Sequence, residues 1–239
     1  MKNLYDDISF KSSKFITKTY STSFSLGIYL LDKSIHEAIY SIYGFVRLAD
    51  EIVDTFHEFP KKQILDDFKS ETYLSLERGI SINPVINAFQ LTVNKYNIDR
   101  EMIDLFLKSM EQDLQDVIYS DHSYHDYIVG SAEVVGLMCL KVFVDGRQDL
   151  YDELESSARS LGAAFQKVNF LRDVKADYEN LGRTYFPDVD LTKFSKEEKI
   201  KIENDINVDF TAALKGIKQL PKSSKLGVYV AYRYYLSLF

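Results

Sequence analysis

The chain has 239 residues, with 29 Lys and Arg against 36 Asp and Glu, so its formal net charge is −7. This balance argues against a general nucleic-acid-binding protein, because affinity for the phosphate backbone depends on clustered Lys and Arg. Hydrophobic residues make up 46% of the chain, which is enough for a substantial core in one large domain or two small ones. With only 10 Gly and 4 Pro there is little material for turns, and long helices with few connections are favoured.

The single cysteine, Cys139, lies in the apolar run 134–144, which is typical of a buried thiol in a reducing cytosol. The first ten residues include Asp6 and Asp7 and have no apolar core, so we expect no signal peptide. No run reaches the roughly 18 apolar residues of a membrane span. We therefore expect a cytoplasmic protein, and peripheral contact with the inner face of a membrane stays open.

The hydrophobic pattern predicts helices throughout, with no extended alternation of the kind that marks a strand. In chain order, the predicted helices span about 12–20, 32–55, 61–77, 84–96, 99–119, 124–144, 149–179, 195–219 and 223–239. We expect an all-α fold in which nine or ten helices surround a central space, as one domain over residues 1–239. The apolar pattern continues to Phe239, where a natural end more often becomes polar, so truncation at the C-terminus is one interpretation.

Asp50 and Asp54 form the first of two Asp-x-x-x-Asp motifs inside predicted helices. Residues four apart lie on the same helix face, so the two carboxylates point the same way and repel by a few tenths of a kcal/mol. Tyr43 and Arg47 extend this polar stripe toward the N-terminus, and the neighbouring positions are mostly apolar. We therefore expect the stripe to face a cavity inside the protein.

Asp173 and Asp177 form the second motif, and Gln166 and Asn169 extend its face. One such motif alone is most often a solvent-exposed helix face. Two copies, each extended by polar side chains, are harder to explain in that way. A hard divalent ion such as Mg²⁺ takes oxygen ligands and is commonly completed by substrate phosphates.

The chemistry that these motifs predict is binding of a diphosphate through two or three Mg²⁺ ions. Arg47, Arg172 and Arg183 would add charge-assisted contacts, and the loop with Arg183 and Tyr185 lies close enough after Asp177 to fold over a charged ligand. The metal would act as a Lewis acid for the departing group, and an apolar chamber would keep water from a carbocation. The sequence has no P-loop, Rossmann glycine fingerprint, Gly-x-Ser-x-Gly motif or zinc signature.

Two stretches have alternative interpretations. The hydroxyl cluster at residues 21–25 is either helix-capping and turn chemistry or a set of neutral donors for a phosphate. The predicted helix 124–144 carries small residues among large ones, either as an ordinary core helix, which its residues favour, or as a groove for an apolar ligand.

Further polar residues are more typical of the surface. Asp113 and Asp116 face either a site or solvent, and the second is favoured. His122 and His125 lack partners at metal-ligand spacing and are interpreted as surface histidines beside a turn at 121–123.

Several motifs, in the same order and at similar separations, resemble those of the squalene/phytoene synthase family over nearly the whole chain. The most specific is the second aspartate motif, with the loop that follows it. The matching stretches are Tyr20–Phe24, Gly44–Asp54, Met110–Leu114, Val134–Met138, Gln166–Asp177 and Gly182–Pro187.

This resemblance implies the all-α isoprenoid synthase fold and Mg²⁺-dependent head-to-head condensation of two prenyl diphosphates through a cyclopropyl intermediate. The implied metal ligands are Asp50, Asp54, Asn169, Asp173 and Asp177. The implied diphosphate contacts are Ser23, Tyr43, Arg47, Arg172, Arg183 and Tyr185. The implied chamber lining is Phe24, Tyr127, Val134 and Gln166. The aspartates, with Tyr43 and Arg47, form the implied catalytic group, and the mid-chain Asp113 gains weight as a site residue.

The chain departs from the family at two places. At residues 130–133 it has Gly-Ser-Ala-Glu where the family usually has a Val-Ala-Gly run, so Glu133 is expected to add a charge near the chamber. It is also shorter at the C-terminus than typical members, in a region that usually helps to close the far end of the cavity. The prenyl length therefore stays open, as does the oligomeric state.

The leading interpretation is formation of phytoene from two C20 diphosphates. The alternative within the family is a squalene or dehydrosqualene synthase acting on C15 diphosphates, with NADPH needed only for squalene. Beyond these lie a terpene cyclase or chain-elongating prenyltransferase, which the second motif fits poorly. A non-catalytic helical binding protein also stays open, and the four intact aspartates argue against it.

Overall fold

The structure is a computed structural model that describes residues 1–114, 121–181, 186 and 195–239, without the side chains of 121–122 and 174–181. The described residues are helical and contain no strand. The elements are α1 (Lys2–Tyr20), α2 (Thr22–Tyr29), α3 (Lys33–Asp54), α4 (Lys61–Arg78), α5 (Pro84–Tyr96), α6 (Arg100–Gln112), α7 (Asp121–Ile128), the π-helical turn η1 (Val129–Glu133), α8 (Val134–Val144), α9 (Gln148–Leu181), α10 (Lys196–Ile217) and α11 (Lys222–Leu238).

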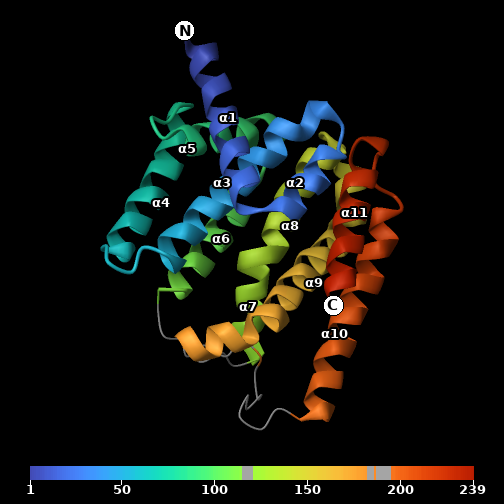
Figure 1. Cartoon of the computed structure of the whole chain (residues 1–239). Helices are drawn as coiled ribbons and strands as arrows, with labels where there is room; N and C mark the ends of the chain where they lie inside the picture. The colour runs from blue at the N-terminus through green and yellow to red at the C-terminus, as the bar shows by residue number, and fades with distance from the viewer. Residues whose placement is uncertain (115–120, 182–185, 187–194) are drawn as a thin grey trace.

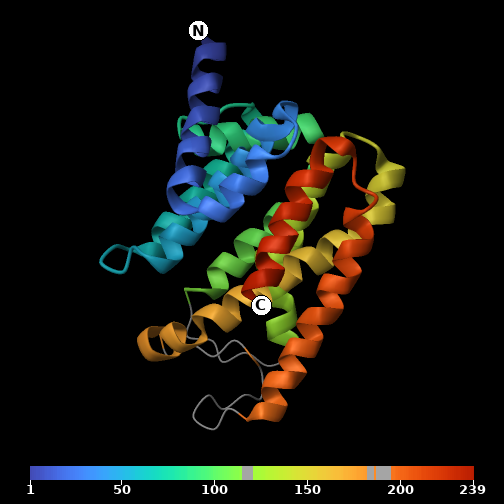
Figure 2. The same cartoon turned by 45° about the vertical axis from the view of Figure 1, so that its right-hand side comes forward.

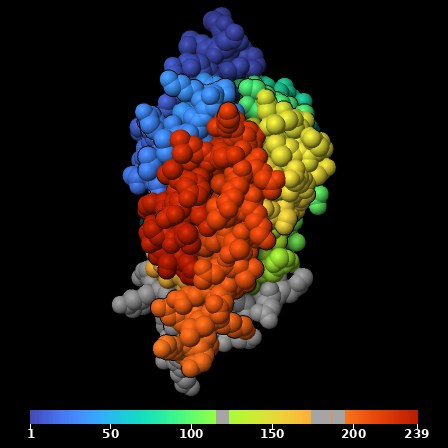
Figure 3. All heavy atoms as spheres, turned by 90° about the vertical axis from the view of Figure 1, so that its right-hand side faces the viewer, coloured from blue at the N-terminus to red at the C-terminus, as the bar shows by residue number. Residues whose placement is uncertain are grey.

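The helices form two groups around α8 and α9 (Figure 1). Helices α1, α3, α4, α5 and α6 pack together on one side, and the pair α10 and α11 covers the other (Figure 2). Helix α9 packs along α10, and α2 packs on α11, so the N-terminal and C-terminal parts of the chain meet. Helices α10 and α11 form one face of the molecule, beside the blue N-terminal helices (Figure 3).

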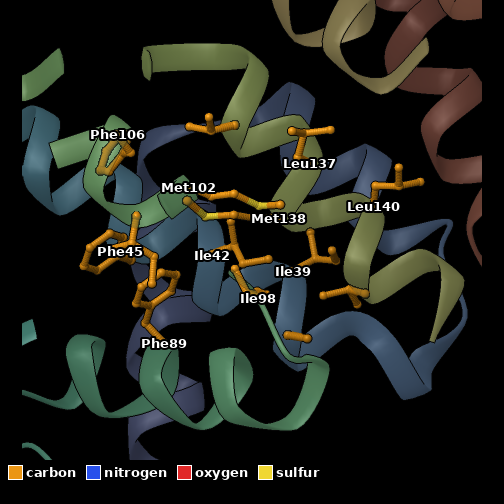
Figure 4. Close-up of a cluster of buried hydrophobic side chains, with 14 of the residues drawn as sticks. Ile39, Ile42, Phe45, Phe89, Ile98, Met102, Phe106, Leu137, Met138 and Leu140 are labelled. Carbon is orange, nitrogen blue, oxygen red and sulfur yellow. The ribbon is translucent and has the colours of Figure 1, made fainter. Parts of the chain in front are cut away.

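The core is built on α3, whose Ile39, Ile42 and Phe45 are buried among α5, α6 and α8 (Figure 4). The Phe45 ring lies 3.8 Å from that of Phe89 at an interplanar angle of 5°, and Phe106 packs against the same ring. Burial of one such aromatic side chain is worth about 1.5–3 kcal/mol. The apolar sides of α3 are therefore fixed in the core, and its polar stripe must face elsewhere.

Side-chain caps define where several helices begin. The Asp32 carboxylate accepts from the Ser34 backbone N–H at the start of α3, and Asn83 caps α5. Ser195 and Glu198 form a reciprocal capping box on α10. The Ser21 hydroxyl accepts from the Phe24 N–H, so part of the hydroxyl cluster caps the short helix α2.

Helix α1 begins at Lys2, ten residues before the predicted start. Its inner face carries Ser9, Ser13 and Thr17, all fully buried against its neighbours. The Ser9 and Thr17 hydroxyls donate to backbone carbonyls four residues earlier, which satisfies them without water. A buried face made of small polar residues has no apolar periodicity, and the sequence pattern therefore missed this part of the helix.

The predicted helix 124–144 is interrupted by the π-helical turn η1. The backbone of residues 121–123, predicted as a turn, already belongs to α7, which packs on η1. The predicted helix 99–119 ends as α6 at Gln112, and residues 115–120 lie outside the described part. A π-helical turn places one more residue in the turn than an α-helix does, so it changes which residues of α8 face the cavity.

One helical stretch in the described residues, Ser123–Val144, is long and apolar enough to cross a membrane. Of its most apolar window, 61% is buried inside the fold, as in the core helix of a folded domain. The sequence analysis found no uninterrupted apolar run of this length, and the stretch does include Asp126, Glu133 and Lys141.

Glycines allow α8 and α9 to touch along their backbones. A Cβ on Gly162 would lie 2.5 Å from the Ala132 carbonyl oxygen, and one on Gly136 would lie 2.8 Å from that of Ala158. Gly162 therefore allows a close backbone approach, and its partner is the η1–α8 segment.

We expect Gly162→Ala to lower the free energy of unfolding by about 2 kcal/mol or more. Alanine would gain up to about 1 kcal/mol in helix propensity. Its Cβ would, however, clash with a backbone carbonyl, which cannot move aside as a flexible side chain can. Ser156→Ala, at an exposed position of the same helix, is the matched control and should change stability by less than about 0.5 kcal/mol. Urea unfolding followed by circular dichroism measures both, and equal stability of the two variants would contradict the close approach.

Candidate active site

A cavity of about 810 Å³ lies between α2, α3, α8, α9, α10 and α11. On α3 it is lined from Ile39 to Asp54, and at 1.5 Å per residue these positions lie about 22 Å apart. One end is polar and is lined by Asp50, Asp54 and Asp173, and the other is apolar. The predicted site residues that line it are Ser23, Phe24, Tyr43, Arg47, Asp50, Asp54, Tyr127, Gln166, Asn169, Arg172 and Asp173.

The first aspartate motif brings carboxylates together in a desolvated place. Asp50 is two-thirds covered, and burial together with the charge of Asp54 raises the pKa of its carboxyl to about 8. Asp113 and Glu51 act in the same direction, and Arg47 opposes them. A carboxyl with this pKa keeps its proton near neutral pH unless a cation offsets the repulsion.

Arg47 lies beside this motif and is held on several sides. Its guanidinium pairs with Glu51, stands 3.9 Å from Asp50, and lies over the Tyr20 ring at 4.5 Å. Its Nε is buried and has no hydrogen-bond partner among the described residues. The Arg47 guanidinium is therefore held in place while its Nε–H donor is unused, and this arrangement suits an anionic ligand in the cavity.

In the second motif, Asp173 is paired with the arginine that precedes it. Arg172 donates to both oxygens of Asp173, at 2.8 Å from Nε and 2.7 Å from Nη2, and this pairing raises the pKa of Arg172. Both side chains are about half exposed, so the pair is easily exchanged for other contacts. The backbone of Asp177 belongs to α9, its side chain lies outside the description, and Arg183 and Tyr185 lie outside the described residues.

Asn169 offers a further oxygen. Its Oδ1 is buried, lines the cavity region and accepts no hydrogen bond from any described group. An unpartnered amide oxygen, one helical turn before Asp173, fits a hard cation, which prefers oxygen ligands. Among the side chains that the structure describes, no three His, Cys, Asp or Glu groups converge closely enough to hold a metal by themselves. The donor set thus fits Mg²⁺ that is completed by ligand oxygens.

Asp113 belongs to the cavity, although its spacing alone favoured the surface. It is buried, and its Oδ2 accepts from the Tyr127 hydroxyl at 3.0 Å. The negative charge of Asp113 also acts on Asp50 and contributes to the raised pKa of the Asp50 carboxyl. The mid-chain motif Met110–Leu114 was the signal that could have added this residue to the predicted site.

Along η1 and α8, the residues that line the cavity differ by one position from the lining residue Val134 that the family resemblance implied. Val134 is buried in the core, and the wall is made by Ser131, Val135 and Cys139 at successive spacings of four. The π-helical turn explains the difference, since it moves the cavity-facing stripe by one residue after Tyr127. Burial raises the pKa of the Cys139 thiol to about 12, so the sulfur behaves as an apolar lining group.

The charge expected near the chamber from Glu133 is neutralised in the protein. Glu133 is buried and stands 3.4 Å from Arg159, which also donates to Glu155. Glu133 does not line the cavity, although its neighbour Ala132 does. The departure from the family motif is therefore compensated on α9 and leaves the chamber apolar.

Tyr20, Phe165 and Tyr235 line the cavity and were absent from the predicted site. The Phe165 and Tyr235 rings stack at 4.0 Å, and burial raises the pKa of Tyr235 to about 12. Tyr20 is the first residue of a recognised motif and could have been included. Tyr235 carries no local signal, because its place depends on how α11 folds back.

Comparison with known proteins places the fold and the family. The family profile described as squalene/phytoene synthase matches residues 17–239. The 4,4'-diapophytoene synthase of Staphylococcus haemolyticus is 28% identical over 192 residues, which are 80% of this chain and 66% of that protein. The phytoene synthase of Arthrospira platensis is 30% identical over 203 residues, which are 80% of this chain and 64% of that protein.

Solved structures show the same architecture. The squalene synthase HpnC from Alicyclobacillus acidocaldarius superposes with a TM-score of 0.83 at 18% identity, covering 96% of this chain and 91% of that one. A dehydrosqualene synthase in complex with ligand gives 0.83 at 20% identity, covering 96% and 84%. The all-α isoprenoid synthase fold predicted from the sequence is confirmed.

The fold, with carboxylates of α3 and α9 lining one cavity, defines a protein of the isoprenoid synthase class. Within that class, the chain belongs to the squalene/phytoene synthase family. It spans slightly less than two thirds of the length of the two curated relatives compared above.

We expect Asp50→Asn to stabilise the chain in the absence of divalent cations. The folded-state pKa of about 8 lies above the ordinary value of 3.8, so the folded chain holds a proton that the unfolded chain releases, and stability falls as pH rises between these values. Because a third of the side chain is exposed, the gain should be on the order of 1 kcal/mol near pH 8, or about 2–4 °C, and should shrink toward pH 4.

Thermal unfolding in EDTA from pH 4 to pH 8 measures this difference. Asp66→Asn, at an exposed carboxylate paired with Lys62, is the control and should show no such pH-dependent gain. A gain that is the same at every pH would show that repulsion at Asp50 is not its cause.

Proposed function

We propose that this chain catalyses Mg²⁺-dependent head-to-head condensation of two prenyl diphosphates through a cyclopropyl (prephytoene diphosphate) intermediate, as one catalytic domain. The leading substrate is the C20 diphosphate, with phytoene as the product. One observation carries the proposal: two polar helix faces from distant parts of a chain of this family line one end of a cavity whose other end is apolar.

The polar end supplies the groups that two diphosphates require. Bound Mg²⁺ would neutralise the diphosphate charge and assist its departure, held by Asp50, Asp54, Asn169, Asp173 and Asp177. In the proposal, Arg172 exchanges its pairing with Asp173 for a diphosphate once a cation takes over that carboxylate. Arg47 keeps its position through Glu51 and Tyr20 and directs its free donor toward the ligand.

Tyrosines and serines would complete the polar end. Burial raises the pKa of Tyr43, so its hydroxyl stays protonated and remains a hydrogen-bond donor. Ser23 lines the cavity two residues after the Ser21 cap, and it offers a neutral donor at the N-terminal end of α2. Arg183 and Tyr185 follow α9 in sequence and are proposed to close over the diphosphates.

The apolar end would hold the hydrocarbon tails and keep water away from the allylic cation. Phe24, Phe165 and Tyr235 form a ring cluster between the two ends, with Phe24 5.1 Å from Tyr43. Aromatic faces carry negative charge density and are compatible with a passing carbocation. The hydrogen bond between Tyr127 and Asp113 fixes another part of the cavity lining.

A C15 substrate is the second candidate, because one solved structure with this fold is named a dehydrosqualene synthase. Relatives named phytoene synthase favour the C20 candidate. NADPH would enter only if the product were squalene. We also propose a cytoplasmic location with peripheral membrane contact, since the product of either reaction is a hydrocarbon.

Incubation of the chain with labelled C15 or C20 diphosphate and Mg²⁺, followed by organic extraction and mass analysis, tests the proposal. We expect a C40 hydrocarbon from the C20 substrate, and none in EDTA or from an Asp54→Ala, Asp177→Ala variant. A C30 product, with NADPH present or absent, would move the assignment to the second candidate. Release of a cyclic terpene or of no hydrocarbon at all would contradict head-to-head condensation.

We further expect Arg47→Lys to lower kcat/KM by about tenfold or more. A lysine ammonium lacks the planar set of N–H donors with which a guanidinium can pair with Glu51 and also contact a diphosphate. Arg100→Lys is the matched control, since Arg100 is exposed and also lies over a tyrosine ring, that of Tyr73. Steady-state kinetics with the preferred diphosphate measures both. Equal activity of the two variants would exclude Arg47 from diphosphate binding.

A further inference from the structure

The C-terminal 30 residues carry a charge opposite to that of the rest of the chain. Residues 210–239 contain Lys215, Lys218, Lys222, Lys225 and Arg233 and have no Asp or Glu. Because the whole chain is −7 and this segment is +5, the preceding 209 residues carry −12. An acidic protein that gathers cations in one segment presents a local site of attraction for anions.

Three of these lysines lie at the turn between α10 and α11 or in the first turn of α11. Lys218, Lys222 and Lys225 are exposed, and none of the ion pairs in the described part of the chain involves them. Exposed lysines such as Lys2 and Lys62 pair with an aspartate four residues away, whereas Lys18 and Lys95 likewise make no ion pair within the described residues. Among the described residues, the charges of these three lysines are therefore not neutralised by an ion pair.

An apolar groove of about 350 Å³ opens among the same three lysines. Its floor and walls include Ile217, Leu226 and Tyr229, and 55% of Leu226 is exposed. A lysine places its charge several ångströms from its backbone and covers apolar surface with its stem. Cations around exposed apolar side chains match the layered chemistry of a lipid surface, with anionic head groups above hydrocarbon.

The neighbouring helix α2 extends the exposed apolar surface. A Cβ on Gly227 would lie 2.5 Å from the Gly27 carbonyl oxygen, so α2 and α11 cross in close contact. Leu26 and Tyr29 of α2 are exposed, Tyr29 by 73%. The Asp32 N–H donates to the Ser223 carbonyl at 2.7 Å, which brings this end of α2 to the start of α11. These two helices belong to the face seen in Figure 3.

Only one layer of side chains separates this groove from the apolar end of the cavity. Ile217 lines both spaces. On α11, Gly227 and Val228 face the cavity, and Leu226 and Tyr229 on either side of them face the groove. The end of the chamber that is farthest from the aspartates therefore lies directly beneath the basic surface.

We propose that Lys218, Lys222, Lys225, Leu226 and Tyr229, with Tyr29 of α2, form a docking surface for a bilayer that contains anionic lipids. The lysines contact the head groups, and the apolar side chains enter the interface. Docking turns the acidic remainder of the chain away from the negatively charged surface. The surface itself rests on charge and exposure alone. Its use in passing an apolar product to the bilayer rests on the proposed function.

The test is flotation of the full chain with vesicles of phosphatidylcholine, with or without phosphatidylglycerol, at low and high salt and without substrate. We expect binding only to the vesicles with phosphatidylglycerol, and release at high salt, because screening weakens exposed charge interactions. Lys218→Glu, Lys222→Glu, Lys225→Glu should lower the vesicle partition coefficient at least tenfold, as an order-of-magnitude expectation for three reversed charges.

The matched control is Lys62→Glu, Lys95→Glu, Lys199→Glu, which changes the net charge equally at exposed lysines on α4, α5 and the far end of α10. It should keep most of the binding. Leu226→Ser, Tyr229→Ser should weaken binding several-fold without changing its dependence on phosphatidylglycerol. The helical circular dichroism of each variant checks that it is folded.

Four results would overturn the proposal: no binding to either vesicle, equal binding to both, equal loss in the two lysine variants, or salt-sensitive self-association in place of vesicle binding. The last would assign the surface to a second copy of the chain, and sedimentation velocity detects it. Failure of the proposed function is separate. It would appear as absence of a hydrocarbon product in detergent, whether or not the chain binds vesicles.

Discussion

The repulsion between carboxylates at the mouth of the cavity is the constraint on which the rest of the structure depends. Asp50 is desolvated beside Asp54 and within the field of Asp113, so its pKa rises to about 8. Such an arrangement destabilises a chain that holds no cation, and the surrounding core has to compensate. The aromatic stack centred on Phe45, on another side of the same helix, keeps the aspartates directed into the cavity.

The cavity exists because the helices around it approach closely elsewhere. Gly162 lets α9 meet the η1–α8 segment backbone to backbone, and Gly227 does the same where α11 crosses α2. Contacts of this kind bring helix axes together at the edges of the cavity and leave the larger side chains to line it. The volume between them is then determined by backbone geometry, which withstands substitution of lining residues better than a space maintained by side chains alone.

The sequence predicted the helices with strong apolar periodicity and the polar stripe on α3, because period and spacing are local properties. It missed the first half of α1, whose buried face consists of Ser9 and Ser13 and therefore lacks apolar periodicity. The family resemblance also implied that Val134 lines the chamber, and it did not reveal the π-helical turn after which Val135 lines it instead. Tyr235 reaches the site only through the return of α11, a tertiary relation that no local pattern encodes.

The π-helical turn has a consequence for how such a chamber can change over evolutionary time. A helix that contains one surplus residue can lose it and become regular, and the part beyond the deletion then rotates by about 100° relative to the part before it. In this chain, one deletion within residues 129–133 would replace the whole stripe of α8 that faces the ligand, without altering any side chain. Insertions and deletions are therefore a route to new cavity shapes here that substitution does not offer.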